Sequence, residues 1–456
     1  MPNHFFVIPN EVDYDKSNEN DNYGDPDDET LTAFTIETFV LFVLAGCGMV
    51  AAGLLLDRAA ASAFFLDVPE SLVLVLALLG LKGNLEMTLA SRISTMANLG
   101  RMSSNFQIVD LFVSNVALVQ TQAIIISLFA SLLATVSHLL EGAVFNAQRA
   151  VCLTITATAT ASVASFVLAN LIFAVALIAR RVGVNPDNVA TPLAAATGDV
   201  TTLFLMMKFG EFFHASRYAS ANAFALGALL ATAPLWAYLA ARQPATRQVL
   251  KYGWFAIFTA MGISSAGGFV LKCSVSSYPQ ISLFQPVVNG AGGNLVAVQA
   301  SKISTYLYKY GKLGVLPMNR LSTYLNPLRT FAGKERESLH ACILLLMAVP
   351  GHCIFLGIFA LVQQFDDYSP DSANPSLVFE WRLLLMYLVA SVIQVAILLY
   401  ICQLISRVIW RISCDPDTNS IPLLTAIGDL LGTVLLGVAF HLHFLWTTAI
   451  GQFTRE

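Results

Sequence analysis

The stretch Gly83-Asn84-Leu85, followed by Ala90-Ser91-Arg92-Ile93-Ser94-Thr95, returns 210 residues later as Gly293-Asn294-Leu295, followed by Ala300-Ser301-Lys302-Ile303-Ser304-Thr305. A second match joins Asn185-Pro186-Asp187 and Gly198-Asp199 to Asp415-Pro416-Asp417 and Gly428-Asp429, at an offset of 230. Two separated matches in the same order indicate a gene duplication. The longer segment 303–338 of the second copy accounts for the change in offset.

The composition indicates that both copies lie in a lipid bilayer. Hydrophobic residues make up 56% of the 456 residues, and charged residues make up only 12%, about half of their share in soluble domains. Apolar runs of about 20 residues predict eleven transmembrane helices in an all-α polytopic membrane protein. They cover 34–56, 68–91, 107–137, 150–179, 189–210, 219–240, 252–272, 281–302, 339–364, 379–406 and 421–448.

The duplication predicts how the helices are grouped. Because five is an odd number, two directly joined five-helix repeats would be inverted, and the extra helix 219–240 makes them parallel. We therefore expect two parallel five-helix repeats joined by a linker helix, with a pathway at their interface. The predicted parts are an acidic, disordered tail 1–33, a first repeat 34–210, a linker 211–251, a second repeat 252–448 that includes the cytoplasmic loop 303–338, and a short tail 449–456.

The basic residues predict the orientation in the membrane. If the amino terminus is cytoplasmic, 17 of the 25 lysines and arginines fall on the cytoplasmic side and seven on the other. Lysine and arginine are retained on the cytoplasmic side, so we expect the N-terminus inside and the C-terminus outside.

Several functions are disfavoured by the sequence. Outside the acidic tail, acids and bases nearly balance, which argues against a nucleic-acid-binding surface. The seven cysteines contain no CxxC pair, so neither a disulfide framework nor a zinc site is expected. The sequence lacks a P-loop, HExxH and GxSxG, which disfavours ATP-driven pumps and the commonest intramembrane hydrolases. We expect a chain that is not an enzyme and has no cofactor.

Ionisable residues inside the apolar runs are the first candidates for function, because burying a charge in lipid is costly. Asp199 and Asp429 occupy equivalent positions in the two repeats. Paired carboxylates at the axis would supply two charges to a divalent cation, and Mg²⁺ favours a few carboxylates plus retained water. Capping of a neighbouring helix is the alternative role for these aspartates.

The Gly-Asn segments are the second group of candidates. Glycines at 83, 292 and 293 let the backbone approach closely or unwind, and the amides of Asn84 and Asn294 add oxygen ligands; close helix packing through small residues is the alternative. Further candidates are Glu86 and Gln299 as ligands and, as residues that line or modulate the pathway, Lys82, Gly83, Gly292, Gly293, Thr197 and Thr425.

Lys82 and Glu86 distinguish the first repeat from the second, in which Gly292 and Val296 stand at these positions. They are four residues apart, so on a continuous helix they would neutralise each other. Alternatively, the Lys82 ammonium lies where a cation would bind and makes the pathway asymmetric.

Two signature stretches carry a family resemblance: Gly80-Leu81-Lys82-Gly83-Asn84-Leu85-Glu86-Met87-Thr88-Leu89-Ala90-Ser91-Arg92, and Asn289-Gly290-Ala291-Gly292-Gly293-Asn294-Leu295 with Gln299-Ala300-Ser301. They resemble the paired signatures of solute carrier family 41, which is similar to two fused copies of the membrane domain of MgtE magnesium transporters. The resemblance covers nearly all of residues 34–448.

The resemblance implies Mg²⁺ transport, with some tolerance for other divalent cations. It also implies a Na⁺ counter-ion in a proposed exchange, and residence in the plasma membrane, although an internal membrane stays possible. It assigns Asp199 and Asp429 as pore ligands and places Asn84 and Asn294 on pore-lining helices. Because the repeats are fused, a monomer is expected to be sufficient.

Two alternatives stay open at this point. Intramembrane aspartyl proteases also carry paired Gly-Asp sequences and use two carboxylates as acid and base, but Gly-x-Gly-Asp does not occur here. The other alternative is a magnesium-sensing subunit that does not transport.

Overall fold

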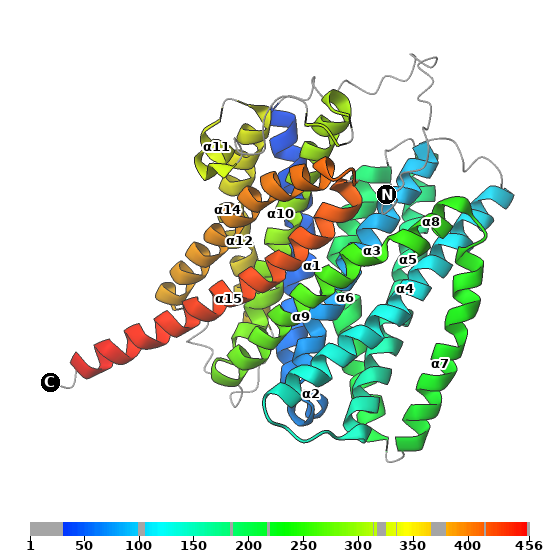
Figure 1. Cartoon of the computed structure of the whole chain (residues 1–456). Coiled ribbons are helices and arrows are strands. Elements are labelled where there is room, and N and C mark those ends of the chain that lie inside the picture. Colours follow the sequence, from blue (N-terminus) through cyan, green and yellow to red (C-terminus); the bar gives the residue numbers. More distant parts are fainter. Residues whose placement is uncertain are drawn as a thin grey trace.

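The structure is a computed structural model of the chain (Figure 1). It describes residues 31–98, 105–182, 186–216, 219–312, 314–316, 325–333, 335–365, 380–414 and 416–453. Within a few of these helices the side chains lie outside the described part, among them those of residues 81–84 and 182–196. The acidic tail, apart from residues 31–33, also lies outside it.

The described residues form long helices and a few short ones. The long helices are α1 (Leu31–Ala60), α3 (Ser71–Asn98), α4 (Asn105–Leu140), α5 (Ala147–Val182), α6 (Pro186–Ala215), α7 (Ala219–Ala240), α9 (Trp254–Ser277), α10 (Ile281–Tyr310), α12 (Arg336–Phe365), α14 (Trp381–Arg411) and α15 (Pro416–Phe453). The short helices are α2 (Ala63–Asp67), α8 (Pro244–Tyr252) and α11 (Pro327–Ala332).

Each of the eleven predicted apolar runs overlaps a long helix over most of its length, and the all-α prediction is confirmed for the described part. Eight of these helices are long and apolar enough to cross a membrane by length and composition, so the chain is an integral membrane protein. Helices α3, α6 and α10 are not among the eight. These three carry the Gly-Asn segments and Asp199, and this polar and small-residue content lowers their hydropathy. The exact count of eleven spans stays a prediction.

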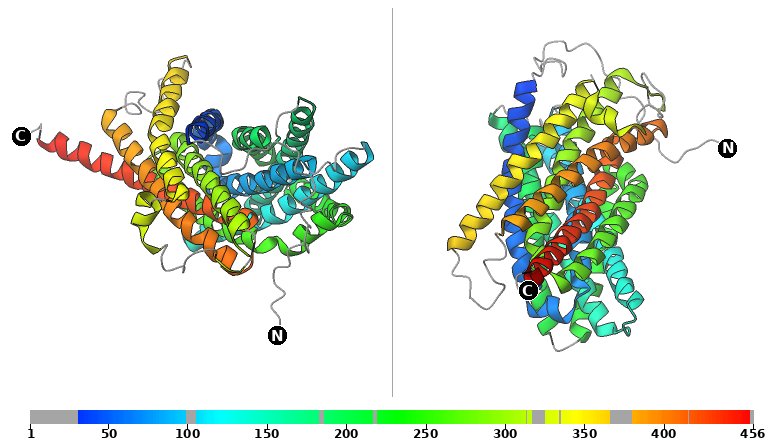
Figure 2. Two further views of the ribbon diagram at one scale, coloured as in Figure 1. Left: turned by 90° about the horizontal axis from the view of Figure 1, so that it is seen from above. Right: turned by 90° about the vertical axis from the view of Figure 1, so that its left-hand side faces the viewer.

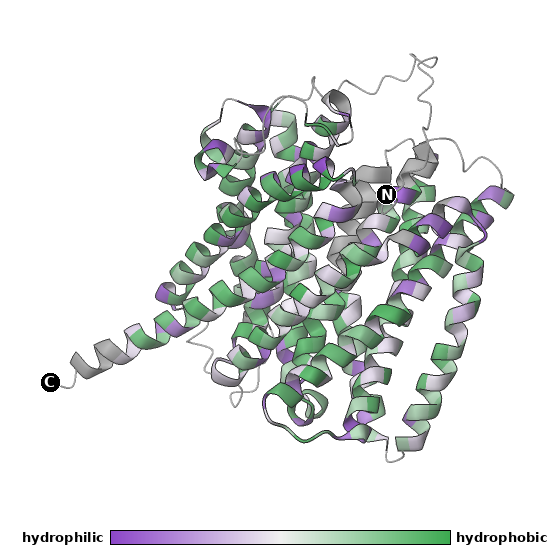
Figure 3. Ribbon diagram, in the orientation of Figure 1, coloured by the Kyte–Doolittle hydropathy of each residue, from purple (hydrophilic) through white to green (hydrophobic). Residues whose placement is uncertain are grey.

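The helices present apolar side chains outward as well as inward, as expected in lipid. On α1, Ile36, Val40 and Leu44 are exposed at intervals of four residues, whereas Met49 and Leu56 are buried. In Figure 3 the ribbons of these helices are mostly coloured as hydrophobic, and many of the hydrophilic residues lie near the helix ends.

Two groups of helices lie on either side of a central set. Seen from above, α12, α14 and α15 lie on one side and α4 to α7 on the other (Figure 2). In the centre, α1 packs against α10 and α6, and α9 packs against α3 and α15. Helices α1 and α9 therefore each contact a helix from the opposite half of the sequence.

Glycines make the two central crossings close. A methyl group added to Gly53 of α1 would overlap the carbonyl oxygen of Leu283, and one added to Gly268 of α9 would overlap that of Val73. In the same way, a methyl group added to Gly290 of α10 would overlap the side chain of Met49, and one added to Gly80 of α3 would overlap the side chain of Ser264. The two sets of contacts therefore match between the halves. On α10, Leu283 and Gly290 follow Val73 and Gly80 of α3 by 210 residues, and on α9, Gly268 and Ser264 follow Gly53 and Met49 of α1 by 215 residues.

Some boundaries differ from the expected ones. Helix α10 continues to Tyr310, and α11 lies within the segment 303–338, so this loop is partly helical. Helix α15 runs from Pro416 to Phe453, beyond both ends of the run 421–448. The hydrogen-bonded helix continues after the apolar run ends, because helix propensity does not depend on hydropathy alone.

Candidate functional site

Asp429 lies where α15 meets α9 and α3. The hydroxyl of Ser264 on α9 donates a hydrogen bond to its Oδ2 at 2.9 Å. On the other side is α3, where a methyl group on Gly80 would be 3.0 Å from the same oxygen. A glycine is therefore required for the carboxylate to lie this close to the α3 backbone.

The helix turn that carries Asp429 is held by side-chain amides from two other helices. Asn289 on α10 donates to the backbone oxygen of Asp429 at 3.0 Å, and Gln394 on α14 donates to that of Gly428 at 3.0 Å. The hydroxyl of Thr433 also donates to the Asp429 oxygen at 2.7 Å. Two consecutive carbonyl groups of α15 thus accept bonds from neighbouring helices.

The first half contributes two acidic residues to the same region. Glu86 on α3 is buried, with 3% exposed, and its Oε2 would be 2.5 Å from a methyl group on Gly198. Its carboxylate therefore lies against the α6 backbone, one residue before Asp199. Helix α3 therefore meets both aspartate-bearing helices, α15 at Gly80 and α6 at Glu86. Two carboxylates, those of Glu86 and Asp429, thus lie against helix backbones at the junction of α3 with α6 and α15.

The glycines of α10 provide close packing in a continuous helix. The backbone of α10 is helical from Ile281 to Tyr310, so no unwinding occurs there. A methyl group on Gly292 would be 2.7 Å from Nε2 of Gln394, and one on Gly293 would be 3.6 Å from Cγ2 of Thr425. Of the two interpretations left open by the sequence, the described geometry of α10 favours close packing.

Other candidate residues lie in different surroundings. Thr425 donates to the carbonyl groups of Ile421 and Pro422 on its own helix, at 3.1 and 3.0 Å. Asn294 and Thr197 are partly buried. The side chains of Lys82, Gly83 and Asn84 lie outside the described part, so the Lys82–Glu86 pair stays a prediction.

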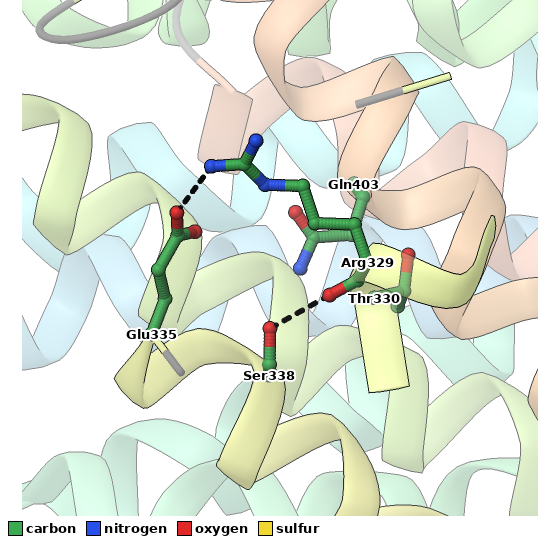
Figure 4. A pocket seen from close by; sticks show the side chains of 5 residues that line it. All are labelled: Arg329, Thr330, Glu335, Ser338 and Gln403. Carbon is green, nitrogen blue, oxygen red and sulfur yellow. Dashed lines mark hydrogen bonds and ion pairs between the residues drawn. The ribbon is translucent and has the colours of Figure 1, made fainter. Parts of the chain in front are cut away.

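Gln299 belongs to a second polar cluster near the α11 end of the molecule. Its amide donates to the backbone oxygen of Glu337 at 3.0 Å, and the Glu337 carboxylate pairs with Arg407, which also binds Gln403. A pocket beside this cluster is lined by Arg329, Thr330, Glu335, Ser338 and Gln403 (Figure 4). The proposed role of Gln299 as a cation ligand stays a prediction.

The described residues contain no group of three or more His, Cys, Asp and Glu side chains that could hold a metal ion. The contacts of Ser264, Asn289 and Gln394 were not predicted from the sequence. In the sequence, each of these three residues is an uncharged polar residue within an apolar run. Such residues are common in membrane helices, so they do not by themselves indicate a site.

Comparison with known proteins decides the family. The profile of the MgtE family, described as "Divalent cation transporter", matches residues 75–209 and 285–439. The chain belongs to the MgtE family. The MgtE match falls on two separate stretches, which together include Glu86, Asp199 and Asp429.

Three relatives extend this likeness over most of the chain. Solute carrier family 41 member 3 of Rattus norvegicus is 40% identical over 91% of this chain and 89% of its own length. Member 2 of Xenopus laevis is 41% identical over 92% of this chain and 73% of its own length. Member 2 of Homo sapiens is 40% identical over 92% and 71%. No solved structure matches the chain.

The MgtE assignment determines the class of function. The chain is a divalent cation transporter of the membrane, and its relatives are solute carriers rather than enzymes. The resemblance noted from the sequence is thus confirmed. The intramembrane protease alternative is excluded.

Proposed function

We propose that the chain transports Mg²⁺, with other divalent cations as possible cargo, through a pathway between its two halves. The observation that supports this most is that α3 contacts both aspartate-bearing helices, since Gly80 lies against the Asp429 carboxylate and Glu86 lies against Gly198, one residue before Asp199. These aspartates are far apart in the chain and occupy matching positions in the repeated segments. Without a cation between them, two nearby carboxylates in a membrane would destabilise each other.

The chemistry of the group suits a hydrated divalent cation. Glu86 adds a third carboxylate, which lies against Gly198, the residue before Asp199, and in this proposal the three charges attract a doubly charged ion. Mg²⁺ binds oxygen ligands and loses its water reluctantly, so it is usually held by one or two carboxylates and retained water. In this proposal Asp199 and Asp429 contact the ion or its water shell, and Asn84 and Asn294 lie on the helices that line the path.

The same proposal includes the repeat architecture. Two parallel five-helix repeats joined by a linker helix are supported by the reciprocal contacts of Gly53 and Gly268 and by the double match to the family profile. In this arrangement α1 and α9 hold corresponding places, and α7 is the linker. A single chain then contains both halves of the pathway, so a monomer is sufficient.

The first test is Mg²⁺ flux into liposomes that contain only the purified chain. We expect the double variant Asp199→Asn, Asp429→Asn to lose nearly all flux, because it removes two charges and keeps the size of both side chains. Asp110→Asn is the matched control. Asp110 lies outside the proposed site and accepts a hydrogen bond of 2.6 Å from Gln243. Full activity of the double variant would contradict the proposal. Mg²⁺ binding without flux in the unmodified chain would favour a sensing subunit.

The second test concerns coupling. Flux that requires an opposing Na⁺ gradient would support exchange with Na⁺ as the counter-ion, whereas Mg²⁺ current that is independent of Na⁺ would support a channel. Residence in the plasma membrane belongs to this proposal, and imaging of the tagged chain against markers of internal membranes tests it.

A further inference from the structure

Asp429, the second-half aspartate of the proposed site, has a set of polar side chains around it. Asp429 and its helix turn are contacted by three buried polar side chains, Ser264, Asn289 and Gln394, which we call the polar framework. These side chains are 1%, 3% and 0% exposed, and they come from α9, α10 and α14. One donates to the carboxylate, and two donate to consecutive backbone oxygens at residues 428 and 429.

The first half has apolar residues at the matching positions. The offset of 215, taken from the glycine contacts, pairs Ser264 with Met49. The offsets of 210 and 230, extended beyond the repeated segments, pair Asn289 with Leu79 and Gln394 with Ala164. The packing shows the first of these correspondences, because the side chain of Met49 lies against Gly290 and the side chain of Ser264 lies against Gly80, the residue that matches Gly290. None of these three residues can donate a hydrogen bond from its side chain to Asp199 or to its helix turn.

The polar framework does more than satisfy its own polar groups. A buried amide needs a partner, but any accessible carbonyl group would meet this need. Instead, amides from two helices reach adjacent carbonyl groups of one turn, and a hydroxyl from a third helix reaches the side chain of that turn. Such contacts around a ligand fix its orientation.

We propose that Ser264, Asn289 and Gln394 are positioning residues that hold the Asp429 carboxylate in one orientation, so that Asp429 discriminates among divalent cations by size. The inference rests on the proposed function, in which Asp429 is a cation ligand. Selectivity between Mg²⁺ and Ca²⁺ depends on ligand number, cavity size and flexibility, and a ligand held in place cannot move outward to accommodate the larger ion.

The test compares Mg²⁺ and Ca²⁺ flux in liposomes that contain the purified chain. The variants are Ser264→Ala, Asn289→Leu and Gln394→Met, and Ser264→Thr is the rescue variant because it keeps the hydroxyl. We expect the apparent Mg²⁺ affinity to fall about 10-fold, the size of effect seen when partners of metal ligands are removed. We also expect the ratio of Mg²⁺ to Ca²⁺ flux to fall, and Ser264→Thr to retain it.

Matched controls separate positioning from stability. Ser391 donates to Tyr387 on its own helix and Gln120 donates to Ser162 of α5, so Ser391→Ala and Gln120→Met remove similar buried groups outside the site. Met49→Leu changes the first-half counterpart of Ser264. All three controls are expected to keep the flux ratio of the unmodified chain.

The two proposals can fail separately. The inference is overturned if Ser264→Ala, which removes a single oxygen atom, keeps the ratio, or if the framework variants lower both fluxes equally. It is also overturned if Met49→Leu changes the ratio as much as Ser264→Ala does. The proposed function itself fails if the Asp199→Asn, Asp429→Asn chain remains fully active.

Discussion

Arg407 is an almost fully buried arginine near the end of α14, and it pairs with Glu337 at the start of α12. Gln403 also binds its guanidinium group. A buried ion pair of this kind adds little net stability over an apolar pair, but removal of one partner leaves an uncompensated charge. The pair therefore links the first turn of α12 to α14.

This arrangement gives a prediction about stability. We expect Arg407→Ala to lower the free energy of unfolding by about 3–5 kcal/mol, and the double variant Arg407→Met, Glu337→Gln to lose clearly less. Arg329→Ala serves as the control, because Arg329 pairs with Glu335 in a more exposed setting and such pairs contribute about 0–1 kcal/mol. Thermal unfolding in detergent ranks the stabilities of these variants. Equal losses in the single and double variants would contradict this account.

At the level of residues, the sequence singled out charged candidates more readily than uncharged ones. Asp199, Asp429 and Glu86 were selected because a carboxylate in an apolar run is rare, and their roles as ligands stay predictions. The polar framework was missed because Ser264 and Gln394 lie in segments that the repeat comparison does not match. Its donors also depend on which helices cross, and a one-dimensional pattern does not contain that information.

Among the helices, the crossings of α1 with α10 and of α9 with α3 depend on single glycines. A side chain at Gly53 or Gly268 would meet a backbone oxygen, which cannot rotate away as a flexible side chain can. Small residues at such crossings let membrane helices approach closely. The two helices of each crossing would have to move apart to accept a methyl group.

We therefore expect Gly53→Ala and Gly268→Ala each to destabilise the chain by about 1–3 kcal/mol, the usual cost of overpacking. Gly262→Ala is the control on α9, because nothing lies within 4 Å of the added methyl group. Fluorescence-detected size-exclusion chromatography after heating gives the comparison. If Gly53→Ala and Gly268→Ala are as stable as Gly262→Ala, the crossings are not close-packed as described.

Helix positions were predicted well, and helix ends less well. Each predicted run overlaps a long helix over most of its length, because an apolar run of about 20 residues has the length of a helix that spans the bilayer. The ends of α10 and α15 extend further, since a helix can continue into water once its backbone bonds are formed. The short helix α2, with Phe64 and Phe65 buried, was missed because five residues are too few to give a periodic signal.

For the molecule as a whole, the distribution of lysine and arginine predicts an orientation. We expect an N-terminal epitope tag to be protected in intact cells and a C-terminal tag to be accessible to antibody from outside. The physical reason is retention of the 17 bases on the cytoplasmic side. Permeabilised cells, in which both tags should be stained, are the control. A protected C-terminal tag together with a stained N-terminal tag would reverse the orientation.

The covalent link between the halves affects how the sequence of such a molecule can evolve. In a symmetric homodimer every substitution appears twice, so a change that helps one copy of a site and harms the other cannot persist. A single chain removes this coupling, and one half can acquire Ser264 and Gln394 while the other keeps Met49 and Ala164. On the duplication proposed here, gene fusion would be the step that made unequal roles for two equivalent aspartates heritable.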